Sequence, residues 1–310
     1  MQVEAELAEL SPEKDMLLTI GVFDGVHLGH KYLISQLKEQ AGQRNLLTGV
    51  VTFRQHPQEV LFPQTKLPFL TDLIERTILL KNEGVDAVVI LSFTQELAQL
   101  RVQQFVSLLK KFLRMWGVVI GSDFALGRNR EGNADTLRRL GQDMDFGVAV
   151  IPPVVINGEV VSSTAIRNAL AGGDMRRVYN LAGRPFSLHG HIITGAGRGT
   201  GLGFPTANLD IDSEQALPAE GVYATWAYIN DKTYQAMTNV GRRPTFGGSE
   251  RIVEVYILDY QHDLYGRELK IDVIERLRDE KRFANVEELK KQIAEDVKHG
   301  KAVLDSRGRD

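Results

Sequence analysis

Five short apolar runs in the first half of the chain constrain the fold more than any other feature. They are too continuously apolar to alternate between an inner and an outer face, so each must be covered on both faces. Segments with helical spacing lie between them, and the resulting strand–helix alternation predicts a doubly wound α/β domain with a parallel sheet. The runs are Leu17–Phe23, Leu47–Phe53, Asp86–Phe93, Gly117–Ile120 and Val148–Val154.

The second half of the chain has a different pattern. Short Val-, Ile- and Tyr-rich segments are separated by Gly, Pro, Asn and Asp, which predicts a small antiparallel β-barrel. One helix follows, with Asn285 as its cap and Glu288 at the capping-box position, and its apolar stripe is expected to pack on the barrel. The predicted strands are His189–Ile193, Gly221–Ile229, Thr233–Val240, Ile252–Asp259 and Glu268–Ile274.

The change of pattern falls near Leu181–Phe186, where Gly and Pro interrupt the chain. We therefore predict two domains, residues 1–183 and 184–310, a division that suits a chain of 310 residues.

Composition excludes several function classes. A net charge of −3 argues against nucleic acid as a partner. The chain has no cysteine, which excludes thiolate catalysis and cysteine-type zinc sites and fits a cytoplasmic location. No segment resembles a secretory signal or a membrane span, so no membrane partner is expected. The sequence does not indicate an oligomeric state.

The first motif is Thr-Ile-Gly-Val-Phe-Asp-Gly-Val-His-Leu-Gly-His at residues 19–30. It places a glycine turn and then a helix N-terminus at the carboxyl edge of the predicted sheet, where anions bind readily. His27 and His30 share one face of that helix and can donate hydrogen bonds to phosphate oxygens. Gly29 between them is expected to let a nucleotide approach the backbone.

This run resembles the HxGH nucleotidyltransferase superfamily, and its closest resemblance is to the prokaryotic FAD synthetases. The resemblance implies a Rossmann-like nucleotidyltransferase domain in which His27 and His30 are catalytic. It also implies that the surrounding residues hold ATP, namely Gly21, Phe23, Asp24, Gly25 and Gly29.

Two later segments support the resemblance. Residues 121–132 form a Gly- and Arg-rich loop after the fourth strand, where Asp123 and Arg128 are candidates for ATP binding, although solvated loop arginines are the common alternative. The Ser-Ser-Thr-Ala-Ile-Arg run begins a predicted helix at residues 165–171 and looks like the family's phosphate-holding signature. Its candidate phosphate ligands are Ser162, Ser163, Thr164 and Arg167.

The second motif is the glycine-rich run at residues 195–209, which ends in Pro-Thr-Ala-Asn. Its glycines can turn backbone N–H groups toward a phosphate, whereas a glycine-rich barrel hairpin is the simpler interpretation. Thr206 and Asn208 are two residues apart, so in an extended chain their oxygens point the same way and suit Mg²⁺.

This run resembles the riboflavin kinase signature. The resemblance implies that Thr206 and Asn208 bind the metal–nucleotide, and that Gly197, Arg198, Gly199 and Gly203 cover its phosphates. It further implies flavin contacts from a set of residues that follow the motif: Asn239, Gly241, Arg243, Pro244, Thr245 and Arg267.

Glu254 lies in an apolar strand segment, where a carboxylate needs a reason. It is either a barrel-surface residue or a general base, and the resemblance implies the base that activates the riboflavin 5′-hydroxyl.

Together the two resemblances imply phosphorylation of riboflavin to FMN and adenylylation of FMN to FAD. ATP, riboflavin and FMN would be the partners, Mg²⁺ would accompany ATP, and FMN and FAD would be substrate and product instead of tightly held cofactors. Two alternatives are a kinase whose nucleotidyltransferase domain is inactive or differently directed, and a non-catalytic flavin or nucleotide sensor.

Overall fold

The computed structural model describes residues 1–194, 201, 203–245 and 248–307, with the side chains of 243–245 and 248–250 left out. The chain divides into two compact units, Met1–Ser163 and Thr164–Asp310, each described here by itself. The predicted domain boundary at residues 183/184 stays a prediction.

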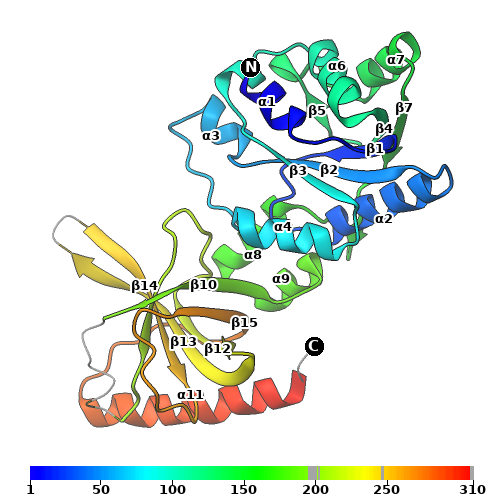
Figure 1. The fold of residues 1–310 in the computed structure, drawn as a ribbon. Coiled ribbons are helices and arrows are strands. Elements are labelled where there is room, and N and C mark those ends of the chain that lie inside the picture. Colours follow the sequence, from blue (N-terminus) through cyan, green and yellow to red (C-terminus); the bar gives the residue numbers. More distant parts are fainter. Residues whose placement is uncertain (195–200, 202, 246–247, 308–310) are drawn as a thin grey trace. The chain divides into compact units, whose positions relative to one another are not determined.

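The first unit contains a parallel sheet with the order β3-β2-β1-β4-β7 (Figure 1). Its strands match the five predicted runs, shortened or extended by a few residues. Both faces of β1 are buried, as expected for a continuous apolar strand. The strands are β1 (Met16–Ile20), β2 (Leu47–Phe53), β3 (Ala87–Leu91), β4 (Met115–Gly121) and β7 (Gly147–Ile151).

Helices and short hairpins connect these strands. The helices are α1 (Gln2–Ala8), α2 (Leu28–Gly42), α3 (Pro57–Leu61), α4 (Leu73–Asn82), α5 (Gln95–Ala98), α6 (Val102–Leu113) and α7 (Ala134–Met144). The short strands are β5 (Ala125–Leu126), β6 (Gly132–Asn133), β8 (Val155–Ile156) and β9 (Glu159–Val160), and η1 is the 3₁₀ turn Arg128–Arg130.

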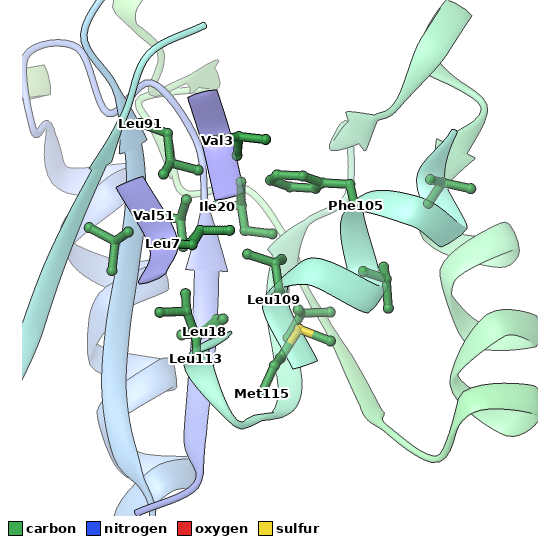
Figure 2. Packing of buried hydrophobic residues seen from close by; sticks show 14 of the residues in the cluster. Val3, Leu7, Leu18, Ile20, Val51, Leu91, Phe105, Leu109, Leu113 and Met115 are labelled. Atoms are coloured by element: carbon green, nitrogen blue, oxygen red, sulfur yellow. The ribbon is translucent and has the colours of Figure 1, made fainter. Parts of the chain in front are cut away.

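Apolar side chains cover the sheet on both faces. On one face, Leu7 of α1 and Leu109 of α6 pack in the same cluster as Ile20 and Leu91 of the strands (Figure 2). A second cluster joins Ile34 and other α2 residues to Leu17, Val50 and Val119. This double coverage fixes the strand ends, and with them the loops at the carboxyl edge of the sheet.

The second unit is built on a closed barrel with the order β10-β11-β14-β13-β12-β15, in which neighbouring strands are antiparallel. The antiparallel barrel predicted from the sequence is confirmed. Its strands are β10 (Phe186–Ile193), β11 (Ala207–Asp210), β12 (Gly221–Ile229), β13 (Lys232–Thr245), β14 (Gly248–Ile257) and β15 (Glu268–Arg278).

Three helices belong wholly or largely to this unit. They are α8 (Ser163–Gly172), α9 (Met175–Ala182) and α11 (Val286–Arg307). The predicted cap of α11 is confirmed, because the Glu288 N–H donates to the Asn285 side chain at 2.9 Å. Helix α11 packs on Trp226 and Met237 of the barrel through Leu304, which confirms the predicted contact.

Within the described part of the chain, no helix is both long and apolar enough to cross a membrane.

Candidate functional sites

The loops after β1 and β4 flank the point where the sheet changes direction. The chain runs outward from β1 through β2 to β3, then returns to the other side of β1 as β4 and continues to β7. In open α/β sheets, ligands bind outside the carboxyl ends of the strands at such a switch point. Residues 21–27 and 122–131, both singled out in the sequence, leave the sheet at this place.

The loop after β1 has an unusual backbone. Phe23 (φ 57°) and Val26 (φ 34°) adopt positive φ values, which are costly for bulky side chains. Gly25 also has a positive φ, and a Cβ there would lie 2.8 Å from Cδ1 of Leu70. Such a strained loop persists only where its surroundings hold it in place.

Asp24 supplies part of that hold. Its carboxylate is 3% exposed and accepts the backbone N–H of Leu70 at 2.9 and 3.0 Å and that of Thr71 at 3.1 Å. The Thr71 hydroxyl in turn accepts the Gly25 N–H at 3.0 Å. Asp24 thus joins the loop to the chain entering α4, and its predicted contact with ATP stays a prediction.

Arg76 of α4 also holds the loop after β1 in place. This side chain is 5% exposed, and it donates to the carbonyl oxygen of Val22 at 3.1 Å and to that of Phe53 at 2.6 Å. One guanidinium therefore connects the loops that follow β1 and β2. Burial lowers the pKa of Arg76, and the nearby negative charge of Asp24 acts in the opposite direction.

His27 and His30 lie together as the sequence predicted. His27 is the N-cap of α2, and its Nδ1 accepts the backbone N–H of His30 at 3.3 Å. In neutral His27 the proton is therefore on Nε2, which is left as a donor. The two rings stack with centroids 3.7 Å apart, and Phe23 meets His30 edge-on at 5.0 Å.

Two small residues, Gly29 and Ser163, lie close to this arrangement. A Cβ on Gly29 would lie 3.1 Å from the His27 ring and 3.2 Å from the carbonyl oxygen of Val161, so here the close approach to Gly29 is made by the protein itself. Ser163, the first residue of α8, donates its hydroxyl to the Asp24 carbonyl at 2.8 Å. The Ser-Ser-Thr run therefore does reach the loop after β1.

The other predicted residues of this unit lie at the surface. Asp123 and Arg128 are exposed on the loop around the β5–β6 hairpin, where Arg130 donates to the Asp123 carbonyl at 3.4 Å. Ser162 is half-buried just before α8. Gly21 follows β1 directly, and a Cβ there would lie 3.2 Å from the Phe23 ring.

Thr164 and Arg167 follow Ser163 on α8 but belong to the second compact unit. Their approach to the two histidines stays a prediction.

A row of three polar residues crosses the barrel. Glu254 on β14 pairs directly with Asn208 on β11 and with Asn239 on β13. Side chains directly opposite on antiparallel strands lie on the same face, with Cβ atoms about 5 Å apart. We name Asn208, Glu254 and Asn239 the polar row. Their neighbours Val253 and Val255 are buried and face the other way, so the row lies on the outer face of the barrel.

The surroundings of the polar row restrict its access. Asn208 is 9% exposed. A Cβ on Gly241 would lie 3.2 Å from the Asn239 amide nitrogen and would clash with the Glu280 carboxylate at 2.3 Å. Phe204, just before Pro-Thr-Ala-Asn, packs edge-on against Tyr256 at 5.5 Å.

Thr206 lines a cavity of about 340 Å³ at one mouth of the barrel. The loop of residues 260–265 forms the opposite wall, with Tyr260 and His262 in edge-on contact at 5.5 Å. No role was predicted for this loop from the sequence.

The remaining kinase predictions cannot all be placed. Gly197, Arg198 and Gly199 lie outside the described residues, and of Arg243, Pro244 and Thr245 only the backbone, in β13, is described. Gly203 is exposed with a positive φ. Arg267 is exposed, and its carbonyl accepts the Ile192 N–H at 2.9 Å.

Oxygen donors suitable for a metal are present beside the polar row. Among the described residues, no three His, Asp or Glu side chains converge as metal ligands. The Asn208 amide and the Thr206 hydroxyl fit a hard cation that takes its remaining ligands from nucleotide phosphates and water.

Comparison with known proteins gives the two units separate matches. Residues 10–165 match the family model of FAD synthetase, and residues 182–304 match that of riboflavin kinase. A curated relative from Escherichia coli (strain K12), a bifunctional riboflavin kinase/FMN adenylyltransferase, is 39% identical and covers 92% of each chain. A relative of the same description from Pseudomonas fluorescens is 36% identical over 98% of each chain.

A solved structure has the same fold. A protein of Streptococcus pneumoniae described as a macrolide-efflux protein superposes with a TM-score of 0.89 at 30% identity, covering 97% of each chain. The sequence matches span both units, so the chain belongs to the bifunctional riboflavin kinase/FMN adenylyltransferase family.

Proposed function

We propose that this chain makes FAD from riboflavin in two ATP-dependent steps, one in each unit. The observation that carries this is the pairing of two sets of chemical groups with two family matches. The His27–His30 pair lies in the FAD synthetase match, and the polar row lies in the riboflavin kinase match.

In the first unit, an oxygen of the FMN phosphate attacks the α-phosphorus of ATP, and pyrophosphate leaves. Negative charge grows on the phosphoryl oxygens as this happens. Nε2–H of His27 and the imidazole of His30 are proposed to donate to those oxygens, at a helix N-terminus that favours anions. Arg128 and the Ser163 segment are proposed to hold the leaving phosphates.

In the second unit, the riboflavin 5′-hydroxyl attacks the γ-phosphorus of ATP and gives FMN and ADP. We assign Glu254 as the base that takes the hydroxyl proton, because it stands between two amides on the outer face of the barrel. Asn239 is placed to orient the flavin beside it.

The kinase nucleotide is proposed to lie in the cavity lined by Thr206. Mg²⁺ held by Thr206, Asn208 and the phosphates would supply the charge neutralisation on which phosphoryl transfer depends. ATP, riboflavin and FMN are thus the proposed partners. A cytoplasmic location, favoured by the lack of cysteine, and the absence of a nucleic-acid partner stay predictions.

The test is to incubate the protein with riboflavin, ATP and Mg²⁺ and to separate the flavins over time. We expect FMN first and then FAD. The variant His30→Ala should stop at FMN, and Glu254→Gln should make FAD only when FMN is supplied. A protein that makes FMN but no FAD from supplied FMN would be the kinase alone, and one that makes neither would be a sensor. Equal loss of both activities in His30→Ala would contradict the assignment of one reaction to each unit.

A further inference from the structure

A cavity of about 550 Å³ lies on the outer face of the barrel, apart from the polar row. We name it the α9 cavity, because helix α9 forms one wall, strands β12, β13 and β15 form the floor, and the last described residue of α11 forms the rim. Its lining residues from α9 and the rim are Arg176, Tyr179, Asn180 and Arg307, and those of the floor include Trp226, Tyr228, Thr233 and Asp272.

The α9 cavity shares no lining residue with the kinase site described above. Trp226 is four residues along β12 from Val222, which pairs with Asn239 of the polar row. Four residues of strand span roughly 13 Å. The α9 cavity is therefore a separate place on the barrel from the polar row.

Aromatic side chains form the apolar part of this cavity. Trp226 and Tyr228 alternate along β12 on its outer face, and Tyr179 faces them from α9. Tyr179 and Tyr228 are each 37% exposed, so part of each side chain is open to solvent. Such rings suit the face of a planar heteroaromatic group.

The polar groups of the cavity are mainly donors. The side chains of Arg176, Asn180 and Thr233 have no hydrogen-bond or ion-pair partner among the described residues. The Arg307 guanidinium is held at the rim by Glu275 and by the Ile274 carbonyl oxygen.

The one carboxylate of the lining is already occupied. Asp272 accepts the hydroxyls of Ser187 and Tyr228, each at 2.6 Å. The groups left for a ligand are thus the guanidinium of Arg176, the amide of Asn180 and the hydroxyl of Thr233, and this set favours a phosphate.

From this combination we propose that the α9 cavity binds a planar heteroaromatic monophosphate, with the ring between Tyr179 and the β12 aromatics and the phosphate on Arg176. Its volume lies within the roughly 300–1,000 Å³ typical of small-molecule sites. Two compounds of this class are the candidate ligands, a flavin mononucleotide and an adenine mononucleotide. The inference concerns binding alone and does not rest on the proposed reactions.

Tryptophan fluorescence tests the proposal directly, because the chain has two tryptophans and only Trp226 lines the cavity. In the full chain carrying Trp116→Phe, the emission reports on Trp226. We expect saturable quenching by AMP, by FMN or by both, and at least tenfold weaker quenching by adenosine than by AMP. Whichever monophosphate binds more tightly identifies the source of the ligand.

Variants on α9 make the test specific. Adding Arg176→Glu, a change at an exposed residue, should weaken the affinity at least tenfold, whereas Arg177→Glu beside it should not. AMP does not absorb tryptophan emission, so its signal is free of energy transfer from a flavin in the kinase site. For FMN, equilibrium dialysis should show one fewer bound molecule per chain in the Arg176→Glu variant.

The proposal is overturned if millimolar AMP and FMN both leave Trp226 emission unchanged. It is equally overturned if Arg176→Glu binds them as tightly as its parent, or if adenosine binds as well as AMP.

Discussion

Both carboxylate oxygens of Asp24 accept the backbone N–H of Leu70, at 2.9 and 3.0 Å. The two residues are 46 positions apart, yet this contact decides the shape of the loop that carries His27.

Replacing Asp24 by Ala should destabilise the first unit by about 2–4 kcal/mol, because two buried N–H groups lose their acceptor and Arg76 loses its nearest negative charge. FAD formation from FMN should fall with it, while FMN formation from riboflavin should persist. Urea unfolding and the two activity assays measure this, with the exposed Asp135→Ala as control. Unchanged unfolding would show that the carboxylate does not hold the loop.

Arg76 should act as a positioning residue, because its guanidinium bridges two loop carbonyls without reaching the reacting atoms. Arg76→Lys keeps the charge but cannot span both oxygens, so we expect kcat/KM for FMN adenylylation to fall about tenfold, or about 1.4 kcal/mol. Arg76→Met should lose at least another tenfold. If Lys and Met behaved alike, with equal loss of stability, the role of Arg76 would be packing alone.

His27→Asn should separate folding from catalysis. Asparagine is a good N-cap and can accept the His30 N–H as His27 does, so the free energy of unfolding should change by less than about 1 kcal/mol. The variant lacks the Nε2–H donor, and kcat for adenylylation should drop about 100-fold. His27→Ala should lose stability as well. Near-normal turnover in His27→Asn would exclude His27 as a donor to the transition state.

The attachment of α1 should depend on pH through Glu6. Its carboxylate accepts the Ser92 N–H at 2.8 Å and the Ser92 hydroxyl at 2.6 Å. Burial raises the pKa of Glu6, but these bonds and one from Gln2 outweigh it, and the pKa lies below its ordinary 4.5. A lowered carboxyl pKa stabilises the fold above the unfolded value, and this stabilisation is lost as the pH falls below 4.5 through the folded pKa.

The measurement is the urea midpoint of the wild type and of Glu6→Gln, which does not titrate, at several pH values. The wild type should be the more stable at pH 6, and the difference should shrink below pH 4.5. A difference that stays constant with pH would refute the assignment to Glu6.

Much of the fold was predictable because the patterns are local. The bounds of β2 and β12 match the predicted Leu47–Phe53 and Gly221–Ile229. By contrast β11 was missed. This strand has only four residues directly after Pro-Thr, and it forms only through its pairing with β10 and β14. Helix α9 was missed because it is short, although Asp174 caps it by accepting the Arg177 N–H.

Some residues of the candidate sites were likewise indicated by the sequence, and others were missed. His27 and Glu254 could be proposed from the sequence because their motifs are continuous. Arg76 was missed, since its contacts with Val22 and Phe53 join segments 54 and 23 residues apart. An arginine within an apolar helical stretch was the one available signal. The α9 cavity gave no signal at all, because its walls come from five separate elements.

The compact units meet within a helix, at Ser163 and Thr164 of α8. On the barrel side of that point, the Leu170 carbonyl accepts the Ala219 N–H at 2.9 Å, and α9 contacts β15 and β10. A recombinant kinase fragment that began at Arg184 would expose the strand surface that α9 covers. An evolutionary exchange of the N-terminal unit for another would likewise have to keep α8 and α9 with the barrel, because both helices contact it.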